Sequence, residues 1–182
     1  TADGSGNWSG DITLSAGVNS IVATARDAAN NTSADSAALS ITVDTTAPAA
    51  TGTPDLAAAS DLGSSSTDNI TNDTTPTFDI SCVTGTTVQL YSDAVATGTS
   101  GTCTAGTVSL TAGTLAAGSR SITAVQTDPA GNASPASGAL VITLDTTADA
   151  ATGTPDLQAA SDTGSSNSDN ITNDTTPTFD IS

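Results

Sequence analysis

Residues 77–83 read TFDISCV, in which Phe78, Ile80 and Cys82 alternate with polar residues. An apolar residue at every second position is the pattern of a β-strand that buries one face. The same alternation recurs in residues 86–92 (TTVQLYS), 107–110 (TVSL), 121–126 (SITAVQ) and 139–145 (ALVITLD). Gly, Pro, Asp and Asn separate these runs, and no stretch has helical periodicity. Several short strands without a helix predict an all-β fold, a β-sandwich.

The sequence repeats itself with a period of 101 residues, which is the offset between Asp44 and Asp145. Residues 44–81 and 145–182 are identical at 33 of 38 positions, whereas 1–43 and 102–144 are identical at 17 of 43. A fixed period indicates a tandem array. We also expect the chain to be a segment of a longer protein. The predicted domains are the end of a preceding repeat at 1–47, a complete repeat at 48–147 and the start of a following repeat at 148–182.

The composition excludes several functions. All 19 acidic residues are Asp, and the two basic residues are Arg26 and Arg120, which gives a net charge of −17. Nucleic acid and anionic membrane surfaces are therefore not expected partners, because both require clustered basic residues. His, Lys, Met and Glu are absent, which removes most general bases and imidazole ligands, so we predict that the chain is not an enzyme. No apolar run is long enough to predict membrane insertion within this segment.

The two cysteines, Cys82 and Cys103, both lie in the complete repeat. A disulfide between them would stabilise the repeat by on the order of 3 kcal/mol, and two buried free thiols are the alternative. The position matching Cys103 in the preceding repeat is Ala2, so a disulfide would belong to one repeat and not to the array.

Residues 61–73 read DLGSSSTDNITND and concentrate carboxylate and amide oxygens in a polar stretch. Ca²⁺ prefers such hard oxygen ligands and tolerates irregular geometry. The EF-hand pattern does not fit, because its final ligand is Glu. The alternative is that Asp and Asn simply populate turns and keep an acidic chain soluble. Crowded carboxylates repel one another, and a divalent cation would remove that cost, which favours calcium.

The motifs ADGSGNWSG (2–10), SIVATARDAANNTS (20–33) and ITVDTTAP (41–48) resemble the end of bacterial immunoglobulin-like repeats from giant, type I-secreted surface adhesins. Residues 54–78 resemble the start of the next repeat. The resemblance implies tandem immunoglobulin-like sandwiches, exported from the cell, with Ca²⁺ near the domain junctions. The cysteine pair departs from the family pattern. So does Asn30–Asn31, where related turns have Gly-Asn, and this leaves the geometry of that turn open.

The resemblance also implies a set of metal ligands. These lie in the duplicated loop, at the ends of the last strands, and in the turn DPAGN near the junction with the first repeat. The candidates are Asp61, Asp68, Asn69, Asn72 and Asp73; their copies Asp162, Asp169, Asn170, Asn173 and Asp174; and Asp44, Asp145, Asp128 and Asn132. The sequence leaves open whether the loop faces the preceding or the following junction.

The leading functional hypothesis is a structural extender: part of an adhesin stalk, extracellular or on a bacterial cell surface, that is rigidified by calcium at its junctions. Its partners would be neighbouring repeats of the same chain, and the target of the adhesin is not predicted. One alternative is a subunit of a filament that assembles by strand complementation. Another is a module that binds glycan or protein, although such sites usually expose several aromatic residues.

Overall fold

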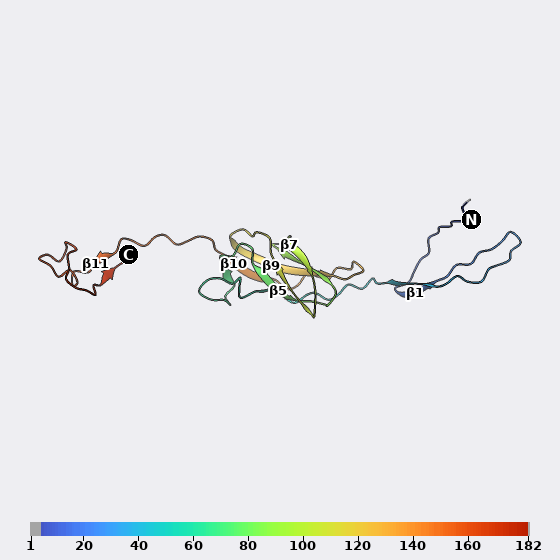
Figure 1. Ribbon diagram of the computed structural model, residues 1–182, viewed down its shortest axis with the longest axis horizontal. Helices are drawn as coiled ribbons and strands as arrows, with labels where there is room; N and C mark the ends of the chain where they lie inside the picture. Colours follow the sequence, from blue (N-terminus) through green and yellow to red (C-terminus); the bar gives the residue numbers. More distant parts are fainter. Residues whose placement is uncertain (1–4, 182) are drawn as a thin grey trace. The chain divides into compact units, whose positions relative to one another are not determined.

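The computed structural model describes residues 5–181 (Figure 1). The chain divides into two units, with the boundary between Thr146 and Thr147. Within residues 5–181 every regular element is a β-strand, which confirms the all-β prediction. The same residues contain no helix of the length and apolarity that crossing a membrane requires.

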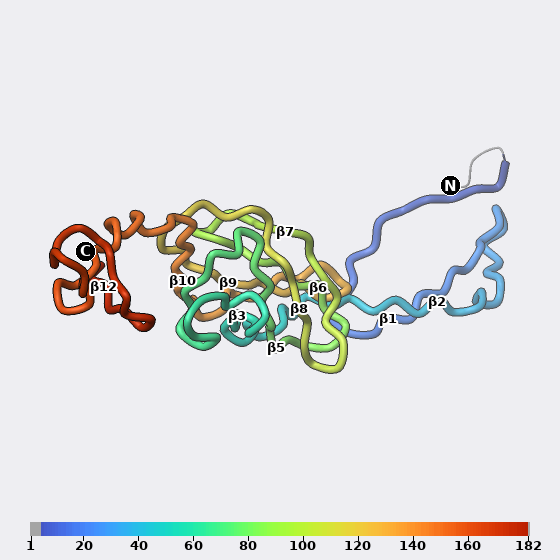
Figure 2. The backbone as a smooth tube through the Cα atoms, turned by 60° about the vertical axis from the view of Figure 1, so that its left-hand side comes forward, coloured from blue at the N-terminus to red at the C-terminus, as the bar shows by residue number. Residues whose placement is uncertain are grey.

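The first unit contains a sandwich of two sheets. The larger sheet has five strands in the order β4–β10–β9–β6–β7, and the smaller has three in the order β3–β5–β8. In Figure 2 the strands of the smaller sheet lie side by side. The strand bounds are β3 Asp55–Leu56, β4 Ile70–Thr71, β5 Thr77–Ser81, β6 Thr87–Ser92, β7 Val95–Thr102, β8 Thr107–Thr111, β9 Gly118–Thr127 and β10 Leu140–Leu144. All neighbours pair antiparallel except β4 and β10, which are parallel.

The core lies between the two sheets, as the alternating pattern predicts. Phe78 and Ile80 of β5 are 0% and 1% exposed, and they pack with side chains from both sheets. The other buried apolar strand positions are Leu56, Val88, Leu90, Leu110, Ile122, Ala124, Ile142 and Leu144. Cys82 continues the inward pattern only in part, because it lies just beyond β5 and is half-buried.

Two further strand pairs lie outside the sandwich. β1 (Gly17–Ile21) pairs antiparallel with β2 (Leu39–Val43), and β11 (Asp156–Leu157) pairs antiparallel with β12 (Phe179–Asp180). Phe179 is 52% exposed, although its counterpart Phe78 is fully buried. The strand pairing therefore forms locally, whereas burial requires the opposing sheet.

Candidate metal-binding loop and the two ends of the domain

The acidic loop, residues 61–73, follows the turn after β3 and includes β4. The Asp61 side chain is 3% exposed. Its Oδ2 atom accepts a hydrogen bond from the backbone N–H of Asn69 at 3.2 Å, whereas its Oδ1 atom is buried without a hydrogen-bond partner. A buried carboxylate oxygen without a donor is energetically costly. A bound cation would remove that cost, so Asp61 fits a metal ligand.

The second unit repeats this arrangement at Asp162. That side chain is 4% exposed, its Oδ2 accepts from the N–H of Asn170 at 3.1 Å, and its Oδ1 is also buried without a partner. In the described part of the second unit, residues 147–181, the only strands are β11 and β12. The conformation of the loop is therefore specified by its own residues and not by a surrounding sandwich.

Two residues that the sequence prediction did not single out, Ser60 and Thr71, hold the acidic loop closed. The Thr71 hydroxyl, on a side chain that is 1% exposed, donates to the carbonyl oxygen of Ser60 at 2.5 Å. The Ser60 hydroxyl donates to Oδ2 of Asp73 at 2.9 Å. The matching positions in the second copy of the loop have the same residues, Ser161 and Thr172. This identity is the signal by which the sequence could have pointed to Ser60 and Thr71.

The remaining acidic-loop candidates differ in how their oxygens are used. Both carboxylate oxygens of Asp73 already accept hydrogen bonds, because Oδ1 accepts from the N–H of Thr75 at 2.9 Å. Asp68 is exposed, and its Oδ1 accepts from the N–H of Ile70 at 3.1 Å. Asn72 is exposed as well. Asp68 and Asn72 therefore lie where solvent and ions reach them.

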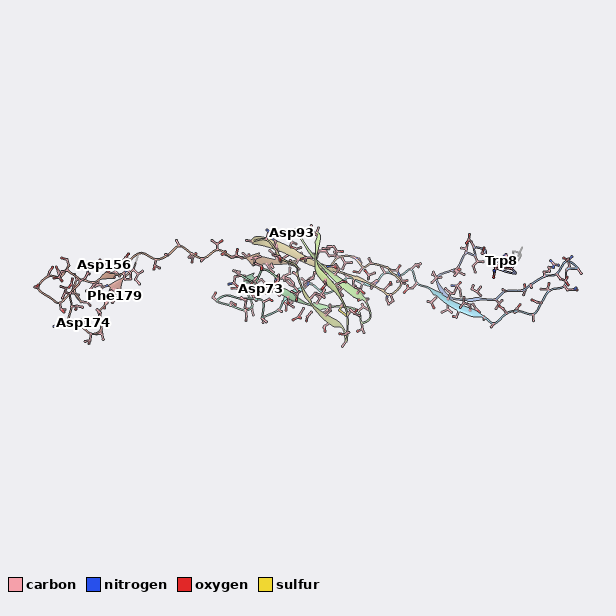
Figure 3. All side chains as sticks on the ribbon, turned by 45° about the horizontal axis from the view of Figure 1, so that its top comes forward. Trp8, Asp73, Asp93, Asp156, Asp174 and Phe179 are labelled. Atoms are coloured by element: carbon pink, nitrogen blue, oxygen red, sulfur yellow. A yellow bond between two sulfur atoms is a disulfide. The ribbon has the colours of Figure 1, made fainter. Side chains whose placement is uncertain are left out.

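The second copy keeps some hydrogen bonds of the first and replaces others. Asp169 and Asp174 each accept from the N–H two residues ahead, at 3.1 and 2.9 Å, as Asp68 and Asp73 do. Asn173 instead accepts a hydrogen bond from the hydroxyl of Thr163. Figure 3 labels Asp174 in this unit, together with Asp156 and Phe179 of its strand pair.

The structure shows at which end of the domain the acidic loop lies. The carbonyl oxygen of Asn69 accepts from the N–H of Thr143, and that of Thr71 accepts from the N–H of Asp145, both at 2.9 Å. Asn69 has a φ of 60°. This lies in the left-handed region, which Asn tolerates in a tight turn. The loop therefore lies beside the end of β10, where the chain leaves the domain (Figure 1).

The turn at Asp128–Asn132 lies where the chain enters the domain. The side-chain Nδ2 of Asn132 donates to the carbonyl oxygen of Asp44 at 3.1 Å, just beyond β2. Asp128 accepts from the N–H groups of Ala130 and Asn132 through Oδ1, and from Asn132 Nδ2 through Oδ2, each at 2.9 Å. Both carboxylate oxygens of Asp128 therefore have hydrogen-bond donors without a cation.

A turn with the same hydrogen bonds forms around Asp27, in residues 27–31. Asp27 accepts from Asn31 in the way that Asp128 accepts from Asn132. Asn30 has a φ of 73° and occupies the place of Gly131, which has a φ of 94°, so the Asn-Asn sequence leaves the turn unchanged. In both turns the hydrogen bond from the Asn side chain is the main cause that lowers the carboxyl pKa.

The two cysteines form the predicted disulfide. Cys82 and Cys103 are bonded, with their Cα atoms 6.0 Å apart and a separation of 21 positions in sequence. The bond ties the segment that follows β5 to the segment that follows β7. The prediction of a disulfide rather than two free thiols is confirmed.

The predicted ligands do not gather at one point. Over residues 5–181, no three Asp or Cys side chains converge as a cluster that could hold a metal ion. Asp61 and Asp145 are at the end where the chain leaves the domain, and Asp44, Asp128 and Asn132 are at the end where it enters. A cation at either end would therefore need main-chain oxygen, hydroxyl or water ligands in addition to the carboxylates.

A sandwich that packs β3–β5–β8 against β10–β9–β6–β7, with a short parallel strand added at β10, defines an immunoglobulin-like module. The profile of the bacterial Ig-like domain family matches residues 47–146 and 149–182, and the chain belongs to that family. Members of this family are typically structural modules and are usually extracellular or surface-associated. A comparison with curated proteins found no significant match.

Proposed function

We propose that this chain is a stretch of an adhesin stalk on the outside of a bacterial cell, in which Ca²⁺ bound at the acidic loops stiffens the joints between repeats. The buried, unpartnered Oδ1 of Asp61, repeated at Asp162, carries the proposal. Ca²⁺ supplies a divalent charge that takes oxygen ligands. Asp61 would hold it together with oxygen donors of the same loop, of which Asp68 and Asn72 are exposed.

The connection from the loop to the joint runs through the main chain. The carbonyl oxygens of Asn69 and Thr71 accept hydrogen bonds from the N–H groups of Thr143 and Asp145. An ordered acidic loop therefore fixes the direction in which the chain leaves β10. An ion that neutralises Asp61 removes the cost of its buried charge and so stabilises this conformation of the loop. Chelation would loosen the loop and, with it, the linker.

The experiment uses the full chain in Ca²⁺ and in excess EDTA. Small-angle scattering should give a smaller maximum dimension in EDTA, because a flexible linker averages over bent conformations, and calorimetry should give a lower melting temperature. The variant Asp61→Asn/Asp162→Asn should lose the response to Ca²⁺. Asp11→Asn/Asp35→Asn, which changes the net charge equally at exposed positions, should keep it. A maximum dimension and melting temperature that EDTA leaves unchanged would rule out the stiffening role.

Assembly by strand addition is the second candidate, and the exposed strand pairs favour it. Phe179 and Ile171 are 52% and 66% exposed in the second unit, and Leu39 of β2 is 60% exposed. Such faces bind a complementary strand. Sedimentation velocity of the full chain over a hundredfold concentration range would reveal it, and a monomer throughout would exclude it.

A further inference from the structure

We propose that the Cys82–Cys103 disulfide is a redox-sensitive lock on the linker that enters the complete domain. Reduction of the disulfide releases residues 49–52 from the sandwich, and the sandwich itself stays folded. The inference goes beyond the stalk role and does not require calcium. It rests on one juxtaposition. The loop of residues 82–86, which the disulfide closes, and the entering linker are hydrogen-bonded to the two ends of the same buried amide, that of Gln126.

The disulfide borders the loop that connects β5 to β6. The main chain of Cys103 also pairs with this loop, because its N–H donates to the carbonyl oxygen of Thr86 at 2.8 Å and its carbonyl oxygen accepts from the N–H of Gly85 at 3.0 Å. The loop in turn supplies two donors to Oε1 of Gln126, the N–H of Val83 and the hydroxyl of Thr86, each at 2.8 Å. The disulfide therefore holds in place the groups that orient Gln126.

The amide of Gln126 transmits the position of the loop to the linker. An amide side chain is planar, so the donors that hold its oxygen also determine where its nitrogen points. With Oε1 held by the loop, Nε2 donates to the carbonyl oxygen of Ala49 at 2.7 Å. A loop that moves away leaves Oε1 buried without a donor, which favours another orientation of the whole amide. The bond to Ala49 therefore depends on the loop that the disulfide fixes.

The docked linker carries a cost that its release would remove. Thr51 is 7% exposed, and its hydroxyl is buried without a hydrogen-bond partner, which is unfavourable. Besides the bond at Ala49, the N–H of Gly52 donates at 2.9 Å to the carbonyl oxygen of Ser81, the last residue of β5. Pro54 is fully buried and β3 pairs with β5, so the chain stays anchored beyond the linker. Residues 49–52 can therefore detach without opening the sandwich.

The sequence pairs the disulfide with the glutamine. At an offset of 101 residues, alanine stands in place of both Cys103 and Gln126, at Ala2 and Ala25. The main chain is nevertheless alike at the second of these positions, since the N–H of Ala25 donates to a serine hydroxyl as that of Gln126 does. The side chains that the lock requires are therefore present together in one place and absent together in the other, as expected for parts of one device.

The lock opens by thiol–disulfide exchange with a dithiol reductant. A thiolate of the reductant attacks one sulfur, forms a mixed disulfide and releases the other cysteine. The second thiol of the reductant then displaces the first cysteine and closes a cyclic disulfide, so two electrons and two protons pass to the protein. Cys82 is half-buried, whereas Cys103 is 1% exposed, so access favours attack at Cys82. The loop that carries Val83 is then free to move off Gln126.

The test is ¹⁵N relaxation of the full chain before and after reduction with dithiothreitol. This measurement reports motion in the folded state and not the free energy of unfolding. On reduction, the order parameter of the Gly52 N–H should fall from about 0.85 to below about 0.6. The N–H of Thr143 is the internal control, because it is bonded to Asn69 at the end where the chain leaves the domain, and its order parameter should not change.

Three variants separate the lock from a general loosening. Cys82→Ala/Cys103→Ala should show a flexible Gly52 with or without dithiothreitol. Gln126→Ala should show a flexible Gly52 in the oxidised protein, and reduction should add nothing. Gln89→Ala is the matched control, because its amide lies in the same sheet and bonds outside this network, so it should respond to reduction as the wild type does.

Reduction of the wild type needs no substitution, so it decides the question even if Gln126→Ala does not fold. The lock would be overturned by a Gly52 that stays rigid on reduction, by an equal loss of order at Thr143, or by loss of the folded state. It would also be overturned by a folded Gln126→Ala chain in which Gly52 stays rigid until the disulfide is reduced.

Discussion

Gln126 of β9 donates from Nε2 to the carbonyl oxygen of Ala49 at 2.7 Å, and so connects the middle of the larger sheet to the linker that enters the domain. The side chain is 1% exposed. Its Oε1 accepts from the N–H of Val83 and the hydroxyl of Thr86, both at 2.8 Å. One buried amide therefore joins the linker, the segment beside the disulfide and β9.

Gln126→Ala should lower the free energy of unfolding by about 2–4 kcal/mol, because it leaves buried polar groups without partners. Urea denaturation measures the change. Gln89→Ala is the matched control, since Gln89 also donates to two carbonyl oxygens, those of Leu90 and Thr97, but is only half-buried. An equal loss in both variants would mean that burial of the Gln126 network adds nothing.

Removal of the disulfide in Cys82→Ala/Cys103→Ala should cost about 3 kcal/mol, because the unfolded chain regains the freedom of the closed loop. The same urea measurement detects it. Dithiothreitol should lower the stability of the wild type and leave that of the double variant unchanged. A response of the double variant to dithiothreitol would contradict this account.

The β6–β7 turn contains an alanine in a conformation that favours glycine. Asp93 and Ala94 have φ values of 49° and 66° between the paired residues Ser92 and Val95, as a two-residue type I′ turn requires. Ala94→Gly should therefore raise the stability by about 0.5–1 kcal/mol.

The turn at Ala105–Gly106 allows the reverse substitution, from glycine to alanine. Gly106 has a φ of 87°, and a Cβ there would have open space around it, so Gly106→Ala tests the backbone alone and should cost about 1 kcal/mol. Melting temperatures that move in the same direction for Ala94→Gly and Gly106→Ala would contradict the interpretation.

Acid should weaken the turns that contain Asp128 and Asp93. The side chain of Asn132 is the main cause of the lowered pKa of Asp128; for Asp93 the backbone N–H of Ser121 is the main cause, followed by Arg120. The pKa of each carboxyl is lower in the folded than in the unfolded protein. The contribution of its hydrogen bonds to stability is therefore fully present above the unfolded pKa, about 3.9, and is lost as the pH falls through the folded pKa.

Carboxyl-detected NMR titration in EDTA checks this for Asp128. Asn132→Ala should raise the pKa of Asp128 toward its ordinary value and make the melting temperature less sensitive to pH below about 4. The pKa of Asp93 should stay where it is in that variant. An unchanged Asp128 titration in Asn132→Ala would show that the side-chain hydrogen bond is not the cause.

The sequence by itself determined the five strands with alternating apolar residues, β5, β6, β8, β9 and β10, and their inward faces, because each depends on residues close together in the chain. A period of two places Phe78 and Ile80 on one face wherever that strand packs. Asn69 and Asn30 take left-handed turns from their own side-chain chemistry. The acidic loop likewise has the same internal bonds at Asp61 and Asp162 with and without a sandwich around it.

Only the tertiary structure decided which end of the domain holds the acidic loop, what Gln126 connects and where β4 pairs. Thr71 meets Leu144, and Gln126 meets Ala49, across long stretches of sequence. No local pattern encodes such pairings, because they depend on how two sheets close over a common core. The buried, unpartnered oxygen of Asp61 recurs at Asp162, so it comes from the loop itself. Only the tertiary structure places that loop beside the end of β10.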